Sequence, residues 1–301
     1  MKFTVLTLFP DIVKVFFENS IMAKAVEKEI IAYDLVNIRD FALDKHHTCD
    51  DGTYGGGAGQ LMMPEPLSKA LDSVNARKKY VIYVTPSGKQ LTQKVAEELS
   101  HKDELVFICG RYEGIDQRII DSYVDAEISI GDYVMSSGEV AVTVIIDTVY
   151  RLIDGVISPE SLEEESFCDG LLEYPQYTHP EEWNGMKVPS VLLSGNHEKI
   201  RKWRLKKRLM KTLLNRPDLI CSARQNGQLS EEAEKMMRKI MTKGPIAVKY
   251  GKTAVNKGYN MSLTDGLELE TDLGALCFAT EDKNEGMKAF LEKREAKFNT
   301  K

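Results

Sequence analysis

The stretch that decides the fold is "AEISIGDYVMSSGEVAVTVIIDTVYRLI", residues 126–153. It opens with a short apolar run typical of a buried strand, 126–131, and then passes through a turn rich in glycine and serine. Residues 140–153 follow, and they are continuously apolar enough to predict a buried helix. A strand, a turn and a packed helix in this order are the building unit of an α/β domain.

Four similar apolar runs precede this stretch and alternate with helical segments. We predict strands at "KFTVLTLF" (2–9), "IIAYDLVNI" (30–38), "YVIYVTP" (80–86) and "ELVFICG" (104–110), in addition to 126–131. This pattern favours an α/β domain with a mostly parallel sheet. Three runs break directly into turns, "TPSGK", "CGRYEG" and "IGDYVMSSGE". Because ligands of open α/β sheets bind at the carboxyl ends of strands, we expect these loops to line a ligand site.

Composition limits the class of protein. The 301 residues are 43% apolar and 29% charged, which is an ordinary globular composition with room for two domains. No run approaches the roughly 18 apolar residues of a membrane span, and Pro10 and Asp11 interrupt the N-terminal run, which argues against a signal peptide. The five cysteines include no CxxC pair, which favours a reducing cytoplasm over a zinc site or a disulfide framework.

The second half of the chain changes character. Residues 158–173 are acidic and without a sustained period, which predicts a linker. Further on, residues 199–216 contain nine Lys or Arg within a chain of net charge −6. Helical spacing there predicts an inward apolar face formed by Ile200, Trp203, Met210 and Leu214. The opposite, outer face would then be basic. The basic face is either a solvated surface or a contact for a phosphate backbone.

The stretch "DDGTYGGGAG", residues 50–59, is either a flexible loop or a backbone that approaches a ligand closely. It is not a GxGxxG turn that opens a helix, and the chain has no GxxxxGK[ST] motif. A nucleotide-like ligand would therefore be held in another way. The loops 109–116 and 129–139 offer backbone groups for an adenine edge and a ribose, with Ile, Tyr and Met side chains to cover the ring.

Five segments in order closely resemble the bacterial tRNA (guanine-N1)-methyltransferases, the TrmD family, from residue 1 to about 240. They are "DDGTYGGGAGQLMMP" (50–64), "CGRYEGIDQR" (109–118), "SIGDYVMSSGE" (129–139), "EEESFCDGLLEYPQYTHP" (163–180) and "VPSVLLSGNHEKIRKWR" (188–204). The resemblance implies a SPOUT methyltransferase domain with a deep trefoil knot at 1–157, an interdomain linker at 158–173 and a small helical tRNA-binding domain at 174–242. It also implies a cytoplasmic homodimer whose active sites are completed by the partner chain.

The resemblance further implies the reaction and its cofactors. S-adenosylmethionine would donate a methyl group to N1 of guanosine 37 of tRNA, where another guanosine precedes it, and magnesium would be required. The matching donor-binding positions are Tyr83, Thr85, Pro86, Gly110, Tyr112, Glu113, Ile130, Gly131, Asp132, Tyr133, Val134, Met135 and Gly138. Glu113 would also act in catalysis, near the positive charge of the donor, and anchor the magnesium ion. Ser137 stands where relatives often have glycine.

Methylation at N1 requires a base for the proton on that nitrogen and a donor for the charge that builds on the neighbouring carbonyl oxygen. By resemblance these are Glu165, where the family has aspartate, and Arg151. Glu164 and Asp169 are the neighbouring alternatives for the base. Both residues also have a non-catalytic interpretation. Glu165 would then be an ordinary solvent-exposed charge, and Arg151 a side chain at the end of a helix that extends its charged group into solvent.

Other residues are assigned to the RNA substrate. A target guanine that is flipped out for reaction needs a backbone without side chains beside it. Gly55, Gly56, Gly57 and Gly59 would supply that clearance, and Tyr54 would stack. Asp50 and Asp51 are expected to cap amides of this loop, and His46 and His47 to contact RNA. Arg201 and Arg204 belong to the basic helix that would bind tRNA.

The tail, residues 243–301, instead resembles the C-terminal helices of enoyl-CoA hydratases of the crotonase family. The oxyanion-hole loops and catalytic glutamates of that family have no counterpart here, so we expect a helical appendage without hydratase activity. Its helical period predicts exposed apolar residues, namely Leu267, Leu273, Leu276, Phe278, Met287, Phe290 and Leu291. Two other functions stay open, a catalytically idle knotted RNA-binding protein and, from the tail alone, an acyl-CoA-binding or hydratase-like protein.

Overall fold

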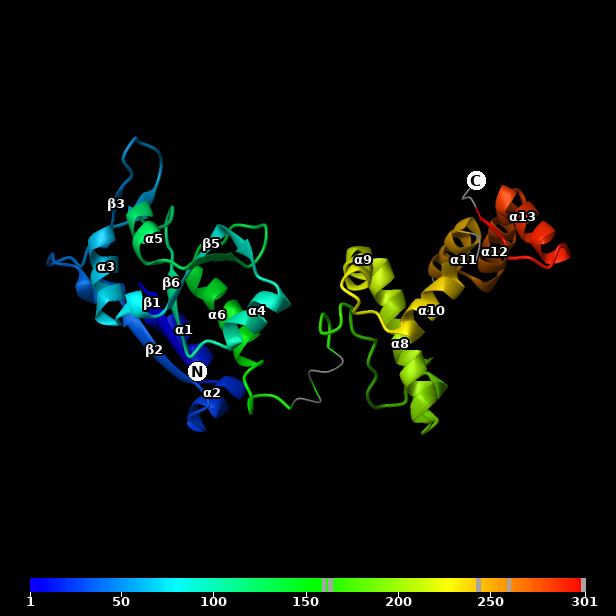
Figure 1. Cartoon of the computed structure of the whole chain (residues 1–301), viewed down its shortest axis with the longest axis horizontal. Coiled ribbons are helices and arrows are strands. Elements are labelled where there is room, and N and C mark those ends of the chain that lie inside the picture. Colours follow the sequence, from blue (N-terminus) through cyan, green and yellow to red (C-terminus); the bar gives the residue numbers. More distant parts are fainter. Residues whose placement is uncertain (159–160, 162–164, 242–244, 259–260, 299–301) are drawn as a thin grey trace. The chain divides into compact units, whose positions relative to one another are not determined.

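A computed structural model describes residues 1–158, 161, 165–241, 245–258 and 261–298. The chain divides into two compact units, Met1–Glu163 and Glu164–Lys301 (Figure 1). The division falls within the acidic segment 158–173. Glu164 and the predicted boundary at 242/243 lie outside the described residues.

A five-stranded sheet forms the centre of the first unit (Figure 1). Its strand order is β2-β1-β6-β5-β7, and every neighbouring pair is parallel. The strands are β1 (Lys2–Thr7), β2 (Ala32–Asn37), β5 (Tyr80–Gln90), β6 (Glu104–Cys109) and β7 (Ala126–Ser129). All five predicted strands are therefore confirmed, as is the α/β class with a parallel sheet. Strand β5 differs in length, because it continues through the predicted turn "TPSGK" with a register shift between Val84 and Lys89.

Helices cover both faces of this sheet. The first face packs against α1 (Pro10–Phe17), α2 (Ser20–Glu27), α4 (Gln93–Ser100) and α6 (Gly138–Tyr150). The second face packs against α3 (Pro64–Ser73) and α5 (Gln117–Tyr123). Strand β6 shows why both faces are covered: Leu105 and Phe107 point into the first layer, and Val106 and Ile108 into the second.

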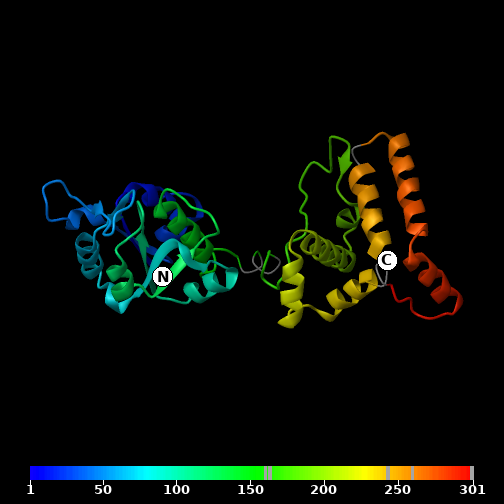
Figure 2. The ribbon, with the colours of Figure 1, turned by 90° about the horizontal axis from the view of Figure 1, so that it is seen from above.

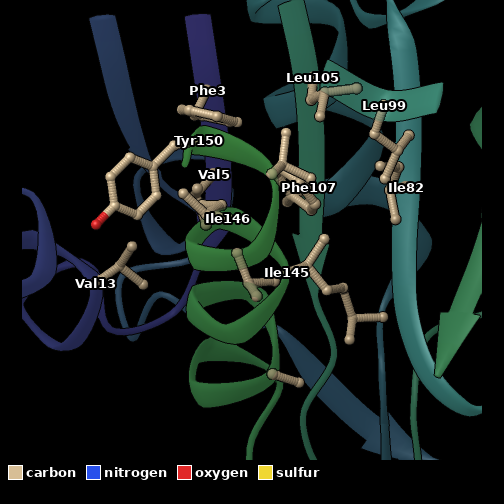
Figure 3. Packing of buried hydrophobic residues seen from close by; sticks show 14 of the residues in the cluster. Phe3, Val5, Val13, Ile82, Leu99, Leu105, Phe107, Ile145, Ile146 and Tyr150 are labelled. Carbon is tan, nitrogen blue, oxygen red and sulfur yellow. The ribbon is translucent and has the colours of Figure 1, made fainter. Parts of the chain in front are cut away.

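The predicted helix at 140–153 is confirmed, with a start at Gly138 and an end at Tyr150. Ile145 and Ile146 are fully buried and lie over the sheet residues Val5 and Phe107 (Figure 3). Arg151 is the residue that caps the helix at its C-terminus.

Shorter elements complete the first unit. Two 3₁₀ turns span Ile38–Phe41 and Ala76–Lys78. The strands β3 (Asp50–Gly52) and β4 (Gln60–Met62) pair antiparallel, and the glycine stretch forms the loop between them. This hairpin loop extends away from the sheet in both views (Figures 1 and 2).

The second unit begins with irregular chain and continues in helices. It contains the short pair β8 (Glu182–Trp183) and β9 (Met186–Lys187), a 3₁₀ turn at Ser190–Leu193, and the helices α8 (His197–Asn215), α9 (Pro217–Gln225) and α10 (Glu231–Met241). A small core joins the start of the unit to these helices, and it consists of Leu171, Leu209, Ile220 and Ala233 with partly buried neighbours such as Leu205.

The predicted inward face of α8 was wrong. Met210 and Leu214 are 40% and 51% exposed, and Ile200 and Trp203 are only half-buried. Leu205, Leu209 and Thr212 lie at helical spacing on another side of the helix. Leu171 and the neighbouring helices pack against that side, so tertiary packing, not the apolar period, determines which face is buried.

The tail forms α11 (Pro245–Gly258), α12 (Leu263–Phe278) and α13 (Glu281–Leu291), and α11 lies beside α12 (Figure 2). Six of the seven residues predicted to be exposed are exposed, and Leu273 is half-buried. Within the described part of the chain, no helix is both long and apolar enough to span a membrane.

Candidate active site

A pocket opens at the carboxyl ends of β6 and β7 and beside residues 83–86 of β5, where the sequence predicted a ligand site. The loops after β6 and β7, these β5 residues and the first turn of α6 line it. Every predicted donor-binding residue lies on its wall except Asp132, whose side chain is exposed. Val84, within the predicted run 83–86, also lies on the wall. The wall further contains residues that the sequence did not assign singly to the donor, namely Arg111, Gly114, Ser129, Ser136 and Ala141, together with the noted Ser137.

Two glycines let the pocket's backbone segments approach each other. A Cβ atom on Gly138 would lie 2.8 Å from the amide nitrogen of Gly110 and 3.0 Å from Cα of Cys109, which are backbone atoms that cannot swing aside. A Cβ atom on Gly110 would lie 2.9 Å from the ring of Tyr83. The first turn of α6 is therefore in direct contact with the end of β6, and the amide of Gly138 donates to the carbonyl of Gly110 at 3.1 Å.

Tyr83 forms part of the pocket wall between these loops. The residue is 6% exposed, and burial raises the pKa of its hydroxyl, which therefore stays neutral and able to donate a hydrogen bond. Tyr112 has a left-handed backbone, φ 56°, and is half exposed at the rim. Partial burial and a hydrogen bond to Asp50 raise the pKa of Tyr112. Asp50 thus contacts the pocket loop directly.

A buried carboxylate lies next to two residues of the pocket wall, Gly138 and Arg111. Glu139, in the first turn of α6, is fully buried and accepts a 2.6 Å hydrogen bond from the hydroxyl of Thr7. Its other oxygen lies 3.0 Å from Nε of Arg111, whose guanidinium stacks 4.6 Å from the centre of the Phe9 ring. A buried charge without a partner costs free energy, so Glu139 stabilises the position of Arg111 beside it. The pair therefore fixes the loop after β6 to α6. No periodic pattern in the sequence predicts this pair.

The glycine hairpin meets the pocket at its base. The amide of Glu113 donates to the carbonyl of Gln60, and the amide of Met62 donates to the carbonyl of Gly114, both at 3.0 Å. A Cβ atom on Gly59 would lie 2.5 Å from a carboxylate oxygen of Glu113. The glycine stretch and the donor loop are therefore one connected surface.

Backbone conformation explains the glycines at the tip. Gly55, Gly56, Gly57 and Gly59 all have φ between 82° and 128°, a region that other residues rarely adopt. Added Cβ atoms at Gly55 and Gly56 would meet nothing within 4 Å, so space near the tip is open on the protein side. Tyr54 is fully exposed beside them. The carboxylate of Asp51 accepts from the amide of Gly52 at 2.7 Å, the capping role expected of it.

The two predicted proton-transfer groups belong to different units. Arg151 caps α6 in the first unit, and Glu165 is half-buried near the start of the second. Asp169, an alternative base, is bound by both terminal nitrogens of the Arg208 guanidinium. That pairing occupies the Asp169 carboxylate.

The basic helix is partly neutralised. Arg201 is paired with Glu198 and, at 2.7 Å, with Glu232, and the pairing holds the pKa of the guanidinium well above its usual range. The guanidinium of Arg204 stacks 4.6 Å from the centre of the Tyr174 ring.

His46 and His47 lie on an exposed turn, where His47 contacts the carbonyl of Arg39. Among described residues no group of three or more His, Cys, Asp or Glu could hold a metal ion.

Comparison with known proteins identifies the family. Residues 1–222 match the model of the tRNA (guanine-1)-methyltransferase family, TrmD, which is most of the chain. The chain belongs to this family. The TrmD relatives include the tRNA (guanine-N(1)-)-methyltransferase of Treponema denticola, 69% identical over 240 residues that cover 80% of this chain and 99% of that protein. Those of Borrelia duttonii and Treponema pallidum are 63% and 58% identical and cover 73% and 80% of this chain, and 92% and 96% of their own lengths.

The tail matches another family. Residues 217–301 match the model of enoyl-CoA hydratase/isomerase, which confirms the resemblance of the tail. This match begins in α9, upstream of residue 243. The 240 aligned residues cover almost the whole TrmD relative from Treponema denticola. The tail helices of this chain therefore have no counterpart in that protein.

Proposed function

We propose that this protein transfers a methyl group from S-adenosylmethionine to N1 of guanosine 37 of tRNA, where another guanosine precedes it. The TrmD match over residues 1–222, combined with a pocket at the strand ends that these residues line, carries the proposal. The alternative, a catalytically idle RNA-binding protein with the same fold, would bind tRNA without transferring a methyl group.

The pocket fits the chemistry of the donor. Tyr83, Tyr112 and Tyr133 supply aromatic surface for an adenine ring, and the loop 130–138 supplies backbone groups for its edge. Glu113 places a carboxylate on the same wall, suited to a positively charged donor. When bound, S-adenosylmethionine supplies the methyl group. We assign the remaining predicted donor-binding residues to the same role, with Asp132 at the rim.

The chain's own residues handle the proton and the charge. Glu165 takes the proton from N1 of the guanine, so that the ring nitrogen has an electron pair for the new bond to carbon. Negative charge develops on the adjacent carbonyl oxygen, and Arg151 stabilises it. Tyr54 stacks on the base, the tip glycines leave room for it, and Arg201 and Arg204 bind the tRNA backbone.

We further propose a homodimer in which Glu165 of one chain completes the site that contains Arg151 of the other. Apolar residues are exposed on α1 and α6, which pack on each other, and they offer a surface for a second copy: Ile12, Val140 and Val144 are 45%, 49% and 41% exposed. The proposed domains are a knotted SPOUT domain at 1–157, a linker at 158–173 and a tRNA-binding domain at 174–242. The free cysteines suit the cytoplasm.

Magnesium is proposed with Glu113 as its protein ligand. Mg²⁺ commonly binds through one or two carboxylates, with water and substrate oxygens as its other ligands. A single carboxylate on the pocket wall meets that minimum requirement. Chelation of divalent cations should then stop methyl transfer, and added Mg²⁺ should restore it.

The decisive experiment uses tRNA transcripts that differ only at position 37. With labelled methyl donor, transfer should occur to the transcript with guanosine 37 and fall to background when adenosine replaces it. Equal labelling of both transcripts, or labelling of neither, would contradict the proposed function.

The tail tests a second function. A chain that ends at Met241 should methylate tRNA at an unchanged rate, because the pocket and the basic helix both precede this residue. The full chain should not hydrate an enoyl-CoA. Hydration of an enoyl-CoA by the full chain that is lost from the shorter chain would instead revive the hydratase-like alternative.

A further inference from the structure

Residues 165–173, here called the base segment, carry Glu165 and fold into a tight turn of their own. The amide of Phe167 donates to the carbonyl of Leu171 at 2.9 Å, and the amide of Glu173 donates to the hydroxyl of Ser166 at 3.0 Å. Phe167 and Gly170 both have φ 79°. The turn therefore has a defined path, and Glu165 stands at its start.

One buried arginine of α8 binds this segment at two points. The guanidinium of Arg208 makes a two-pronged contact with the carboxylate of Asp169, and its Nε donates to the carbonyl of Leu172 at 3.3 Å. Arg208 is only 7% exposed, whereas Lys199, Lys202 and Lys206, at helical spacing, are exposed and form what is here called the outer face of α8. An arginine in this environment is unsuited to contact tRNA, and its planar fork fixes a carboxylate in both distance and orientation.

Further contacts hold the same segment. The amide of Leu172 donates to the hydroxyl of Thr212 at 2.9 Å, and Thr212 is fully buried. A Cβ atom on Gly170 would lie 2.7 Å from Cβ of Ala223, so the turn lies directly against α9. The side chain of Leu171 is 2% exposed in the core of the unit. The base segment is thus held by Arg208, Thr212 and α9, and the points of contact lie only a few residues after Glu165 in the sequence.

We propose that Arg208 is a positioning residue for proton abstraction, because it clamps the base segment to α8. This rests on the proposed function of Glu165. The base is then carried by the same helix whose outer face binds tRNA, so binding of tRNA along α8 also sets the position of the carboxylate. A misplacement of about 1 Å of a reacting group can lower a rate about 100-fold. Thr212 supports the clamp from one helical turn further along.

The test uses single-turnover methyl transfer at saturating donor and tRNA, with binding of each measured separately. Arg208→Gln should lower the rate about tenfold, and Thr212→Val, which is nearly isosteric, should lower it by less. The dissociation constants for donor and tRNA should stay unchanged, because neither side chain lies in the donor pocket or on the outer face. Arg208→Lys should recover only part of the loss, since a lysine cannot bind a carboxylate with two parallel hydrogen bonds.

The matched control is Arg224→Gln. Arg224 makes the same two-pronged pair in the same unit, with Glu234 at 2.7 and 3.0 Å. This pair joins α9 to α10, and its carboxylate belongs to α10 rather than to the base segment. Its loss should leave the methyl-transfer rate unchanged. A fall equal to that of Arg208→Gln would attribute both to loosening of the helices and overturn the proposal.

A double-mutant cycle separates positioning from a general structural role. If Arg208 acts through Glu165, Arg208→Gln should add nothing to Glu165→Gln. Additive losses, an unchanged rate in Arg208→Gln, or a loss explained by weaker tRNA binding would overturn the clamp while leaving Glu165 as base. An unchanged rate in Glu165→Gln would instead refute the proposed function of that residue, which keeps the two failures distinguishable.

Discussion

Replacement of Glu165 by glutamine is expected to lower the rate of methyl transfer by about 100-fold to 10,000-fold, the range usual for loss of a general base. Glutamine keeps the shape of the side chain but cannot accept a proton from N1. Binding of tRNA and donor should be unchanged, because the basic helix and the pocket wall are untouched. Single-turnover labelling at saturating substrates measures the chemical step directly.

The control for this variant is Glu181→Gln, an exposed carboxylate in the same unit. It should behave as the unaltered protein does. A rate in Glu165→Gln within the error of the control would show that another group takes the proton, and Asp169 would be an unsuitable substitute while Arg208 binds it.

Mixed dimers test whether each active site is shared between two chains. Glu165→Gln and Arg151→Gln should each be nearly inactive alone. If the two residues come from different chains, a mixed dimer contains one site with both native residues and one site with neither, so activity should return to about half the value for the unaltered dimer when calculated per mixed dimer. No recovery in purified mixed dimers would indicate that both residues act within one chain.

Gly138→Ala is expected to weaken donor binding roughly 5- to 150-fold, because overpacking of this kind commonly costs about 1–3 kcal/mol. The new methyl group would lie 2.8 Å from the amide nitrogen of Gly110, so α6 and the loop after β6 must move apart. That movement deforms the pocket wall on two sides. Calorimetric titration with S-adenosylmethionine measures the effect, and a lower melting temperature should accompany it.

Gly52→Ala is the matched control. An added Cβ there meets nothing within 4 Å, and its backbone is not left-handed. Donor affinity should stay unchanged. Equal weakening in both variants would mean that the effect does not arise from the contact between Gly138 and Gly110.

The sequence predicted much of the first unit because its strands obey a local rule. Each strand is a short apolar run bounded by turn residues, and these runs predicted the five strands and their parallel arrangement, whereas the strand order came from the structure. The pocket followed for the same reason, since loops at the carboxyl ends of neighbouring parallel strands must meet. Asp132 lies off the wall with an exposed side chain, although its neighbours on both sides line the pocket, and no local pattern in the sequence sets it apart.

Contacts between distant residues were not accessible in this way. Thr7, Arg111 and Glu139 lie far apart in the sequence and meet in one buried cluster, and nothing local distinguishes Arg111 from an exposed arginine. Helix α8 shows the same limit, because it has apolar residues on two sides and only the core with Leu171 selects one of them.

The sequence alone determined the elements, the order of the chemical motifs and the family, since these depend on local composition and on residues near one another in the chain. Only the tertiary structure decided which charges are buried in pairs. Folding removes the side chains of Glu139 and Arg208 from water and brings each close to a partner of opposite charge. The free energy of a charge depends on its exposure to water and on the charges near it in space, not on its neighbours in sequence.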